Sequence, residues 1–170
     1  MTDAPEPVGE KQKQRAHAFF QTANDAALKN NLPYAIDMYR EAIKLDPENL
    51  LFRQALRGVE RRRFQNDPTK VGRLVGARLQ PLRLRARAAK SKGRWHEVLD
   101  ISEDAFSHNP WDVSAAQDAA EAAEHLEFPL LARWMLESVT AQAGEDAGFL
   151  RHLAHVYEIN EEGERAIACW

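Results

Sequence analysis

Small and apolar residues return along this chain at intervals that fit pairs of amphipathic helices. Three stretches, which close at Pro47, Pro110 and Gly144, carry small or apolar residues at the same four distances before the closing residue. These residues are Ala23, Ala35, Tyr39 and Ala42, then Ala86, Val98, Ser102 and Ala105, and finally Ala120, Ala132, Leu136 and Val139. Because such spacing places apolar side chains on one face of a helix, the pattern predicts repeated helix pairs and an all-α fold.

The repeat is regular in the second half of the chain, where successive units start at 79, 113 and 147. The first unit starts at 16, which leaves the interval from 16 to 79 five short of two full periods. The shortfall predicts one degenerate unit. The expected units are 16–49, 50–78 (degenerate), 79–112, 113–146 and 147–170, the last of which is truncated.

This pattern resembles the tetratricopeptide repeat (TPR), a pair of antiparallel helices with a period of about 34 residues. The resemblance covers about 16–49 and 79–170. It implies a single TPR-type α-solenoid over 11–170, because units of this kind bury their apolar faces only by stacking on one another. Small residues equivalent to Ala23 would lie where the two helices of a unit come closest, and Tyr39, Leu136 and Trp170 would fill the space toward the next unit.

Within the degenerate unit, apolar residues at intervals of three and four predict a helix from Leu50 to Arg63. Asp67 and Pro68 predict the start of another helix, which Pro81 would end or kink. The buried stripe expected for that helix is Val71, Leu74, Val75 and Leu79.

Two prolines predict helix starts in the regular units. Pro47 follows Asp46, and Pro110 follows Asn109. We expect each prolyl ring to lie in the first turn of the next helix, behind the side chain that caps it.

The two ends of the chain differ from the repeats. Residues 1–10 hold three acidic residues, two prolines and no basic residue, which predicts a disordered tail and no secretory signal. The chain ends at Trp170, midway through an expected second helix, so we expect it to be the N-terminal part of a longer TPR array. One cysteine precludes an internal disulfide, and no run of 18 apolar residues occurs. These features predict a cytoplasmic protein.

A small net charge of −3 conceals a strong separation of charge along the chain. Residues 53–94 contain 14 basic and two acidic residues, whereas 95–170 contain three basic and 16 acidic residues. The first 52 residues are nearly balanced, with six basic and eight acidic residues. The middle of the molecule is therefore predicted to be basic and its C-terminal repeats acidic.

The resemblance to TPR proteins implies a concave groove lined by the first helix of each unit. It places Arg83, Arg87 and Lys90 in that groove, spaced by four and three residues on one helix face. Such a row can receive carboxylates or phosphates, because arginine offers paired donors. A basic helix that is solvated or that balances the neighbouring acidic repeats explains the same row. The candidate partner-binding residues are Asn24, Arg83, Arg87, Lys90, Gln117, Glu121 and His155.

Two hypotheses of function follow. In the first, the groove of a non-enzymatic scaffold binds an acidic peptide or helix of another protein, with the basic row as anchor and the polar residues as orienters. In the second, the basic segment 53–94 of one copy docks head to tail on the acidic repeats 95–170 of another, which gives a homo-oligomer.

Other partners fit the sequence less well. Nucleic acid would be attracted to the basic segment, but that segment has only Phe64 for base stacking, and the acidic repeats repel a polyanion. A membrane surface would be attracted to the basic segment in the same way, and we expect neither partner. A clamp for chaperone tails is incomplete, because only Asn24 matches it.

Catalysis and cofactor binding have little support. His152 and His155 lie three apart, and His125 could approach them from the preceding unit, but no cysteine or carboxylate pattern completes a metal site. The motifs of phosphate-binding loops, dinucleotide sites and serine hydrolases are absent. We therefore expect no enzyme activity, no cofactor and no metal.

Overall fold

The computed structural model describes residues 9–169, and these residues form helices and turns without any strand. The described residues divide into two compact units, 9–70 and 71–169. Unit 1 contains α1 (Glu10–Leu28), α2 (Leu32–Leu45), α3 (Leu50–Arg63) and a short 3-10 helix, η1 (Pro68–Lys70). Unit 2 contains α4 (Val75–Lys90), α5 (Trp95–His108), α6 (Val113–His125), α7 (Pro129–Glu137), α8 (Thr140–Ala143), α9 (Ala147–Ile159) and α10 (Gly163–Ile167). The predicted all-α class is confirmed.

In unit 1 the three helices stack in chain order. Helix α2 packs on α1, and α3 packs on α2. Ala16 and Ala23 on α1 are fully buried, which lets the backbones of the first two helices approach closely. Phe52 of α3 is also fully buried, and its ring lies 4.8 Å from that of Phe20. The buried alanines between α1 and α2 and the aromatic rings between α1 and α3 thus belong to one core.

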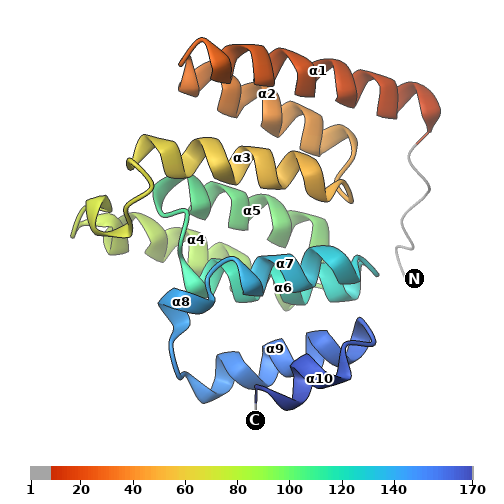
Figure 1. Cartoon of the computed structure of the whole chain (residues 1–170), viewed down its shortest axis with the longest axis vertical. Coiled ribbons are helices and arrows are strands. Elements are labelled where there is room, and N and C mark those ends of the chain that lie inside the picture. Colours follow the sequence, from red (N-terminus) through yellow and green to blue (C-terminus); the bar gives the residue numbers. More distant parts are fainter. Residues whose placement is uncertain (1–8, 170) are drawn as a thin grey trace. The chain divides into compact units, whose positions relative to one another are not determined.

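In unit 2 the helices alternate as antiparallel pairs (Figure 1). Helix α5 packs on α4, α6 on α5, α7 on α6, α9 on α7, and α10 on α9. The small residues expected at the helix crossings are all buried, namely Ala86, Ala120 and Ala154. The second helices α5 and α7 each lie between two first helices, and α10 packs on the last first helix, α9. This is the stacking of helix pairs that the repeat predicts.

The turn between the two helices of a pair has the same geometry in every regular unit. Its backbone is left-handed at the fifteenth position, where Asn30, Gly93, Glu127 and Glu161 have φ between 57° and 66°. At Glu127 the amide donates to the carbonyl of Glu124, and the next amide donates to that of Ala123. This is the Schellman arrangement, which satisfies carbonyls at the end of a helix. The second helices begin two residues later, at Leu32, Trp95, Pro129 and Gly163.

The degenerate unit keeps only its first helix. Helix α3 has the predicted bounds, Leu50–Arg63, and ends in a left-handed turn like the others. The helix predicted from Asp67 and Pro68 is wrong, because only the three-residue η1 forms there before the chain continues irregularly to α4. Asp67 accepts hydrogen bonds from the amide and hydroxyl of Thr69, which caps this short 3-10 turn, and no α-helix begins before Val75.

The predicted buried stripe and the predicted place of Pro47 and Pro110 in a first helical turn are wrong, and of the two alternatives for Pro81 only the helix end is excluded. Of the predicted buried stripe only Leu79 is buried, and Leu74 is 81% exposed. Pro81 lies inside α4 without ending it, since the helix continues to Lys90. Pro47 and Pro110 lie in turns before α3 and α6, and the N-caps of those helices are Asn49 and Asp112.

The terminal predictions fall partly outside the described residues. The tail predicted at 1–10 overlaps α1, which begins at Glu10, and residues 1–8 are not described. Trp170, predicted to fill space toward a next unit, is not described either. Tyr39 and Leu136, which share that role, are buried. A single solenoid over 11–170 stays a prediction.

The left-handed turn residues give a first test. Replacing Glu127 by glycine should raise the free energy of unfolding by roughly 0.5–1 kcal/mol, because a side chain disfavours φ near 61° and glycine does not. Urea unfolding of the full chain measures the change. Glu127→Ala keeps a Cβ and should give no such gain, so equal stabilisation by both variants would contradict the explanation.

Candidate functional site

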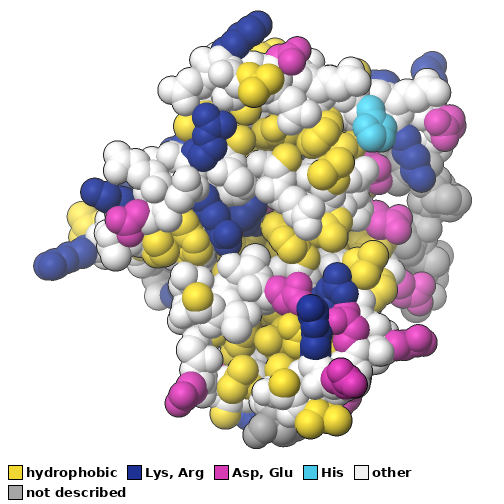
Figure 2. All heavy atoms as spheres, in the orientation of Figure 1, with side chains coloured by type: hydrophobic (Ala, Val, Ile, Leu, Met, Phe, Trp, Pro, Cys, Tyr) yellow, Lys and Arg dark blue, Asp and Glu magenta, His cyan; other side chains and the backbone are white. Residues whose placement is uncertain are grey.

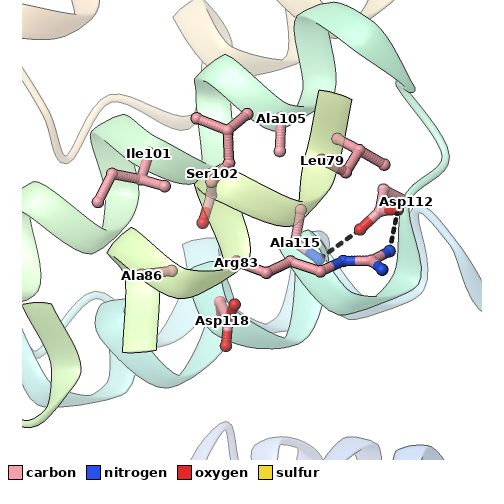
Figure 3. A pocket seen from close by; sticks show the side chains of 10 residues that line it. Leu79, Arg83, Ala86, Ile101, Ser102, Ala105, Asp112, Ala115 and Asp118 are labelled. Carbon is pink, nitrogen blue, oxygen red and sulfur yellow. Dashed lines mark hydrogen bonds and ion pairs between the residues drawn. The ribbon is translucent and has the colours of Figure 1, made fainter. Parts of the chain in front are cut away.

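The predicted basic row lies on α4 and faces the first helix of the next pair, α6. The Arg83 guanidinium donates to Oδ2 of Asp112 over 3.1 Å. The other oxygen of Asp112 accepts the backbone amide of Ala115 over 2.8 Å, so this carboxylate caps α6 while it holds Arg83 (Figure 3). The side chain of Asp112 is 8% exposed and that of Arg83 is 41% exposed.

Lys90 makes the second connection between α4 and α6. Its ammonium group lies 2.8 Å from a carboxylate oxygen of Asp118 and 2.6 Å from one of Glu121. Burial lowers the pKa of Lys90, but the hydrogen bonds and charges of the two carboxylates outweigh burial and hold that pKa above its usual value. Lys90 therefore stays protonated and fixed between the two helices.

The same geometry recurs between α6 and α9, where a glutamate takes the place of the lysine and two histidines take the place of the carboxylates. Glu124 stands at the twelfth position of its unit, as Lys90 does in the preceding one. It contacts His152 over 2.6 Å and His155 over 3.5 Å, and these are the sixth and ninth positions of the next unit. Asp118 and Glu121 occupy those positions on α6. The twelfth residue of one first helix thus reaches the sixth and ninth residues of the next, which forms an ion-pair ladder.

Arg87 stands between Arg83 and Lys90 on α4 and is exposed. Within residues 9–169 it forms no ion pair, in contrast to its two neighbours in the row. Gln117, on the facing helix α6, is half-buried, and His155 on α9 has a side chain that is 59% exposed. We call the residues Arg83, Arg87, Lys90, Gln117, Glu121, Glu124 and His155 the first-helix face. The structure thus places six of the seven candidates in unit 2.

Asn24, the seventh candidate, belongs to unit 1. It accepts a hydrogen bond of 2.6 Å from the hydroxyl of Tyr39, which joins α1 to α2. Burial raises the pKa of Tyr39, and the positive charge of Arg62 offsets part of this effect. Asn24 therefore has a structural bond inside unit 1, whatever it contacts in a complex.

A small pocket opens beside the row, where α4, α5 and α6 meet (Figure 3). The pocket and the open solvent at its mouth together occupy about 240 Å³. Its floor is apolar and contains Leu79, Ala86 and Ile101. Arg83 and Asp112 at its edge bind each other, and the hydroxyl of Ser102 donates to the carbonyl of Val98. Its polar groups are therefore occupied by the protein itself, and the pocket offers little to a small ligand.

A second polar cluster, which the sequence did not predict, joins α7 to α9 and α10. Arg133 binds Glu162, and Arg165 lies 3.0 Å from Glu137 and 3.1 Å from Glu162. Figure 2 shows acidic and basic side chains gathered over the region of α7 and α10. The hydrogen bond that the Arg133 guanidinium donates to Glu162 is the main cause that raises the pKa of Arg133. The cluster fastens the last helix pair to the preceding one.

Tyr157 of α9 belongs to the same cluster. Its hydroxyl donates to Glu137 over 3.1 Å. Burial, with the charge and hydrogen bond of Glu137, raises the pKa of Tyr157 to about 12, although the nearby Arg165 acts in the opposite direction. The phenol therefore stays neutral throughout the physiological range.

Metal ligands and membrane spans were searched for in the described part of the chain. No group of three or more His, Cys, Asp or Glu side chains in residues 9–169 could hold a metal ion. His125, which the sequence allowed to approach His152 and His155, stacks on Trp95 with 3.8 Å between the ring centroids. No helix within these residues combines the length and apolar character needed to cross a bilayer.

Among known proteins, similarity to this chain was found in solved structures. No family model matches the chain, and no curated protein matches it. One similar structure is described as the MamA protein, at 12% identity and a TM-score of 0.49, with 92% of this chain and 88% of that chain covered. Another is YrrB, described as a TPR protein with an unusual peptide-binding site, at 17% identity and a TM-score of 0.47, with 94% and 85% covered. Identities this low assign no binding residues.

The helix pairs themselves have a TPR-like arrangement, as the sequence predicted. Two successive first helices begin at Val113 and Ala147, and the second helices of the same pairs begin at Pro129 and Gly163. Both intervals equal one full period of the repeat read from the sequence.

The dual role of Asp112 gives a second test. Asp112→Ala should lower the free energy of unfolding by about 1 kcal/mol for the lost cap and by a few tenths more for the half-exposed ion pair. Asp146 caps α9 in the same way, through the amide of Phe149, and is the matched control. Chemical denaturation should show the larger loss at Asp112, with the excess removed in an Arg83→Ala background. Equal losses in both backgrounds would mean that the ion pair adds nothing.

The ionisation of Tyr157 gives a third test. Its pKa of about 12 lies above the usual 10, so the stability that this group contributes is present below pH 10 and is lost as the pH rises toward 12. Glu137→Gln should bring the pKa part of the way back, because burial remains, and Arg165→Ala should raise it further. Chemical shifts of the labelled tyrosine ring report the titration. A shift in the same direction for both variants would contradict this assignment of causes.

Proposed function

We propose that the first-helix face of unit 2 binds an acidic segment of another protein, and that the protein is a non-enzymatic interaction scaffold. The observation that carries the proposal is the position of Arg87 in the ion-pair ladder. Arg83 and Lys90, one turn away on either side, are held by carboxylates of α6, whereas Arg87 forms no ion pair within residues 9–169. A guanidinium presented in this way can take a carboxylate through two parallel hydrogen bonds.

Arg83 and Lys90, which already bind carboxylates of α6, have a different role from Arg87, the proposed anchor. A carboxylate of the partner must compete with Asp112 for Arg83, and with Asp118 and Glu121 for Lys90. Since exchanging one carboxylate for another gains little, these two cations contribute positive potential and orientation more than new ion pairs. Gln117 supplies an amide that can donate to or accept from the partner's backbone.

Charge along the first-helix face changes from positive on α4 to negative on α6. Cations stand on α4, whereas Glu121 and Glu124 stand on α6, next to His155 of α9. An acidic residue of the partner is attracted by the cations of α4 and repelled by the carboxylates of α6. The partner's charge should therefore be concentrated over α4, with neutral or basic residues over α6 and α9. Asn24 remains a predicted orienter in unit 1.

A second copy of the chain is the competing partner. Lys90 already binds Asp118 and Glu121 of the same chain, so pairing between the basic segment and the acidic repeats does occur, but inside one molecule. Every such internal pair reduces the charge left for head-to-tail assembly. Light scattering at about 50 mM and 500 mM salt separates the two hypotheses, because assembly through charges dissociates at high salt.

The anchor role of Arg87 gives a fourth test. Arg87→Glu should weaken binding of a short Glu-rich peptide by about tenfold or more, which corresponds to about 1.4 kcal/mol, because a carboxylate would then meet a carboxylate. Fluorescence anisotropy with a labelled peptide measures the affinity. Arg15→Glu, an exposed position on α1 with the same charge change, should leave it nearly unaltered. Equal weakening by both variants would reduce the effect to net charge and would overturn the proposed anchor.

A further inference from the structure

The outward face of α4 is exposed at positions that the first helices α3, α6 and α9 bury, although α1, which begins unit 1, exposes the same positions at Ala18 and Asp25. The third and tenth positions of the units are at most 6% exposed in α3, α6 and α9. These residues are Phe52 and Val59, Ala115 and Ala122, and Phe149 and Val156. The equivalent residues of α4, Pro81 and Ala88, are both exposed, and Leu84 between them is 63% exposed.

The difference follows from what precedes each helix. Helix α3 packs on α2, α6 packs on α5, and α9 packs on α7, so each rests on the second helix of the preceding pair. The degenerate segment before α4 contributes only η1 and an irregular stretch up to Leu74. Helix α4 therefore presents a surface of the kind on which its counterparts receive a helix, and no helix of unit 2 covers that surface.

The exposed face has the spacing of a coiled-coil seam. Five small or apolar residues follow one another at intervals of three, four, three and four, and all are exposed. They are Leu74, Ala77, Pro81, Leu84 and Ala88. This is the a and d pattern that inserts into a neighbouring helix, and the alanines permit a close approach of the two backbones. We call these residues the α4 seam.

Basic residues flank the seam on both sides. Within α4 the e positions are Arg78 and Arg85 and the g positions are Gln80 and Arg87, while Arg73 and Lys92 lie just beyond the two ends of the helix. None of the five cations forms an ion pair within residues 9–169. Because e and g residues select the partner by charge, such a seam favours a helix with acidic flanks and rejects a second α4 seam.

We propose that the α4 seam binds an amphipathic helix of a partner protein that carries apolar a and d residues and Glu or Asp at its e and g positions. A second copy of this chain fits poorly, because the exposed large apolar residues of its acidic region, Leu130, Ile159 and Ile167, lie singly on three helices. A membrane surface also fits poorly. Helices that insert at an interface present aromatic residues and many leucines, and the seam has two leucines and no aromatic residue.

The test uses a designed probe and the full chain. The probe is a synthetic helix of three heptads with Leu at a, Ala at d and Glu at e and g, and a second peptide carries Lys at e and g. Fluorescence anisotropy should show binding of the Glu peptide and at least about tenfold weaker binding of the Lys peptide. Leu84→Asp and the double variant Arg78→Glu/Arg85→Glu should each weaken binding of the Glu peptide about tenfold or more. Circular dichroism checks that both variants fold.

Matched controls separate the seam from general charge and hydrophobicity. Leu130→Asp changes a leucine on α7 that is also more than half exposed, and Lys13→Glu/Arg15→Glu makes the same change of charge on α1. Both should bind the Glu peptide as the unchanged chain does. The proposal is overturned if the Glu peptide fails to bind, if the controls weaken binding equally, or if the Lys peptide binds as tightly. It is also overturned if the seam variants abolish self-association or binding to phosphatidylserine vesicles instead of peptide binding.

Discussion

No helix of this chain can bury its apolar face alone, and every other feature depends on how that constraint is met. The solution is close packing through residues too small to separate the backbones. Ala16 and Ala23 in unit 1, and Ala116, Ala119 and Ala120 on α6, are all fully buried. Packing of this kind fixes the rotation of each helix as well as its distance from the next, because a turned helix would present a longer side chain to its neighbour. The polar side chains on the outer surfaces are then fixed in direction as well.

That fixed rotation explains why polar contacts repeat between unrelated residue types. Lys90 reaches Asp118 and Glu121, and Glu124 reaches His152 and His155, at the same unit positions with different residue types. The packing determines which positions meet, and the sequence determines whether they attract a cation or an anion. A face built in this way can change its specificity without changing its geometry.

Sequence reasoning succeeded where the information is local or periodic. The bounds of α3, the starts of α6 and α9, and the buried alanines all follow from apolar spacing within one helix. It failed where the result depends on a neighbouring helix or on turn chemistry. Helix α1 begins at Glu10 although its first turns have no apolar stripe, and Pro47 lies in a turn instead of a helix. The bond of Arg83 to Asp112 joins residues 29 apart, and no pattern in either helix alone indicates it.

The shared turn geometry has a consequence for insertions and deletions. Since a helix turns by about 100° per residue, one residue gained or lost within a first helix would rotate every later side chain away from its partner. The gain or loss of one whole repeat unit would preserve both the left-handed turn and the ladder. The degenerate segment is where the spacing of this chain already departs from the period, by five residues. Insertions and deletions should therefore be tolerated in the degenerate segment, or elsewhere as complete repeat units. A single residue added to or removed from a first helix should not be tolerated.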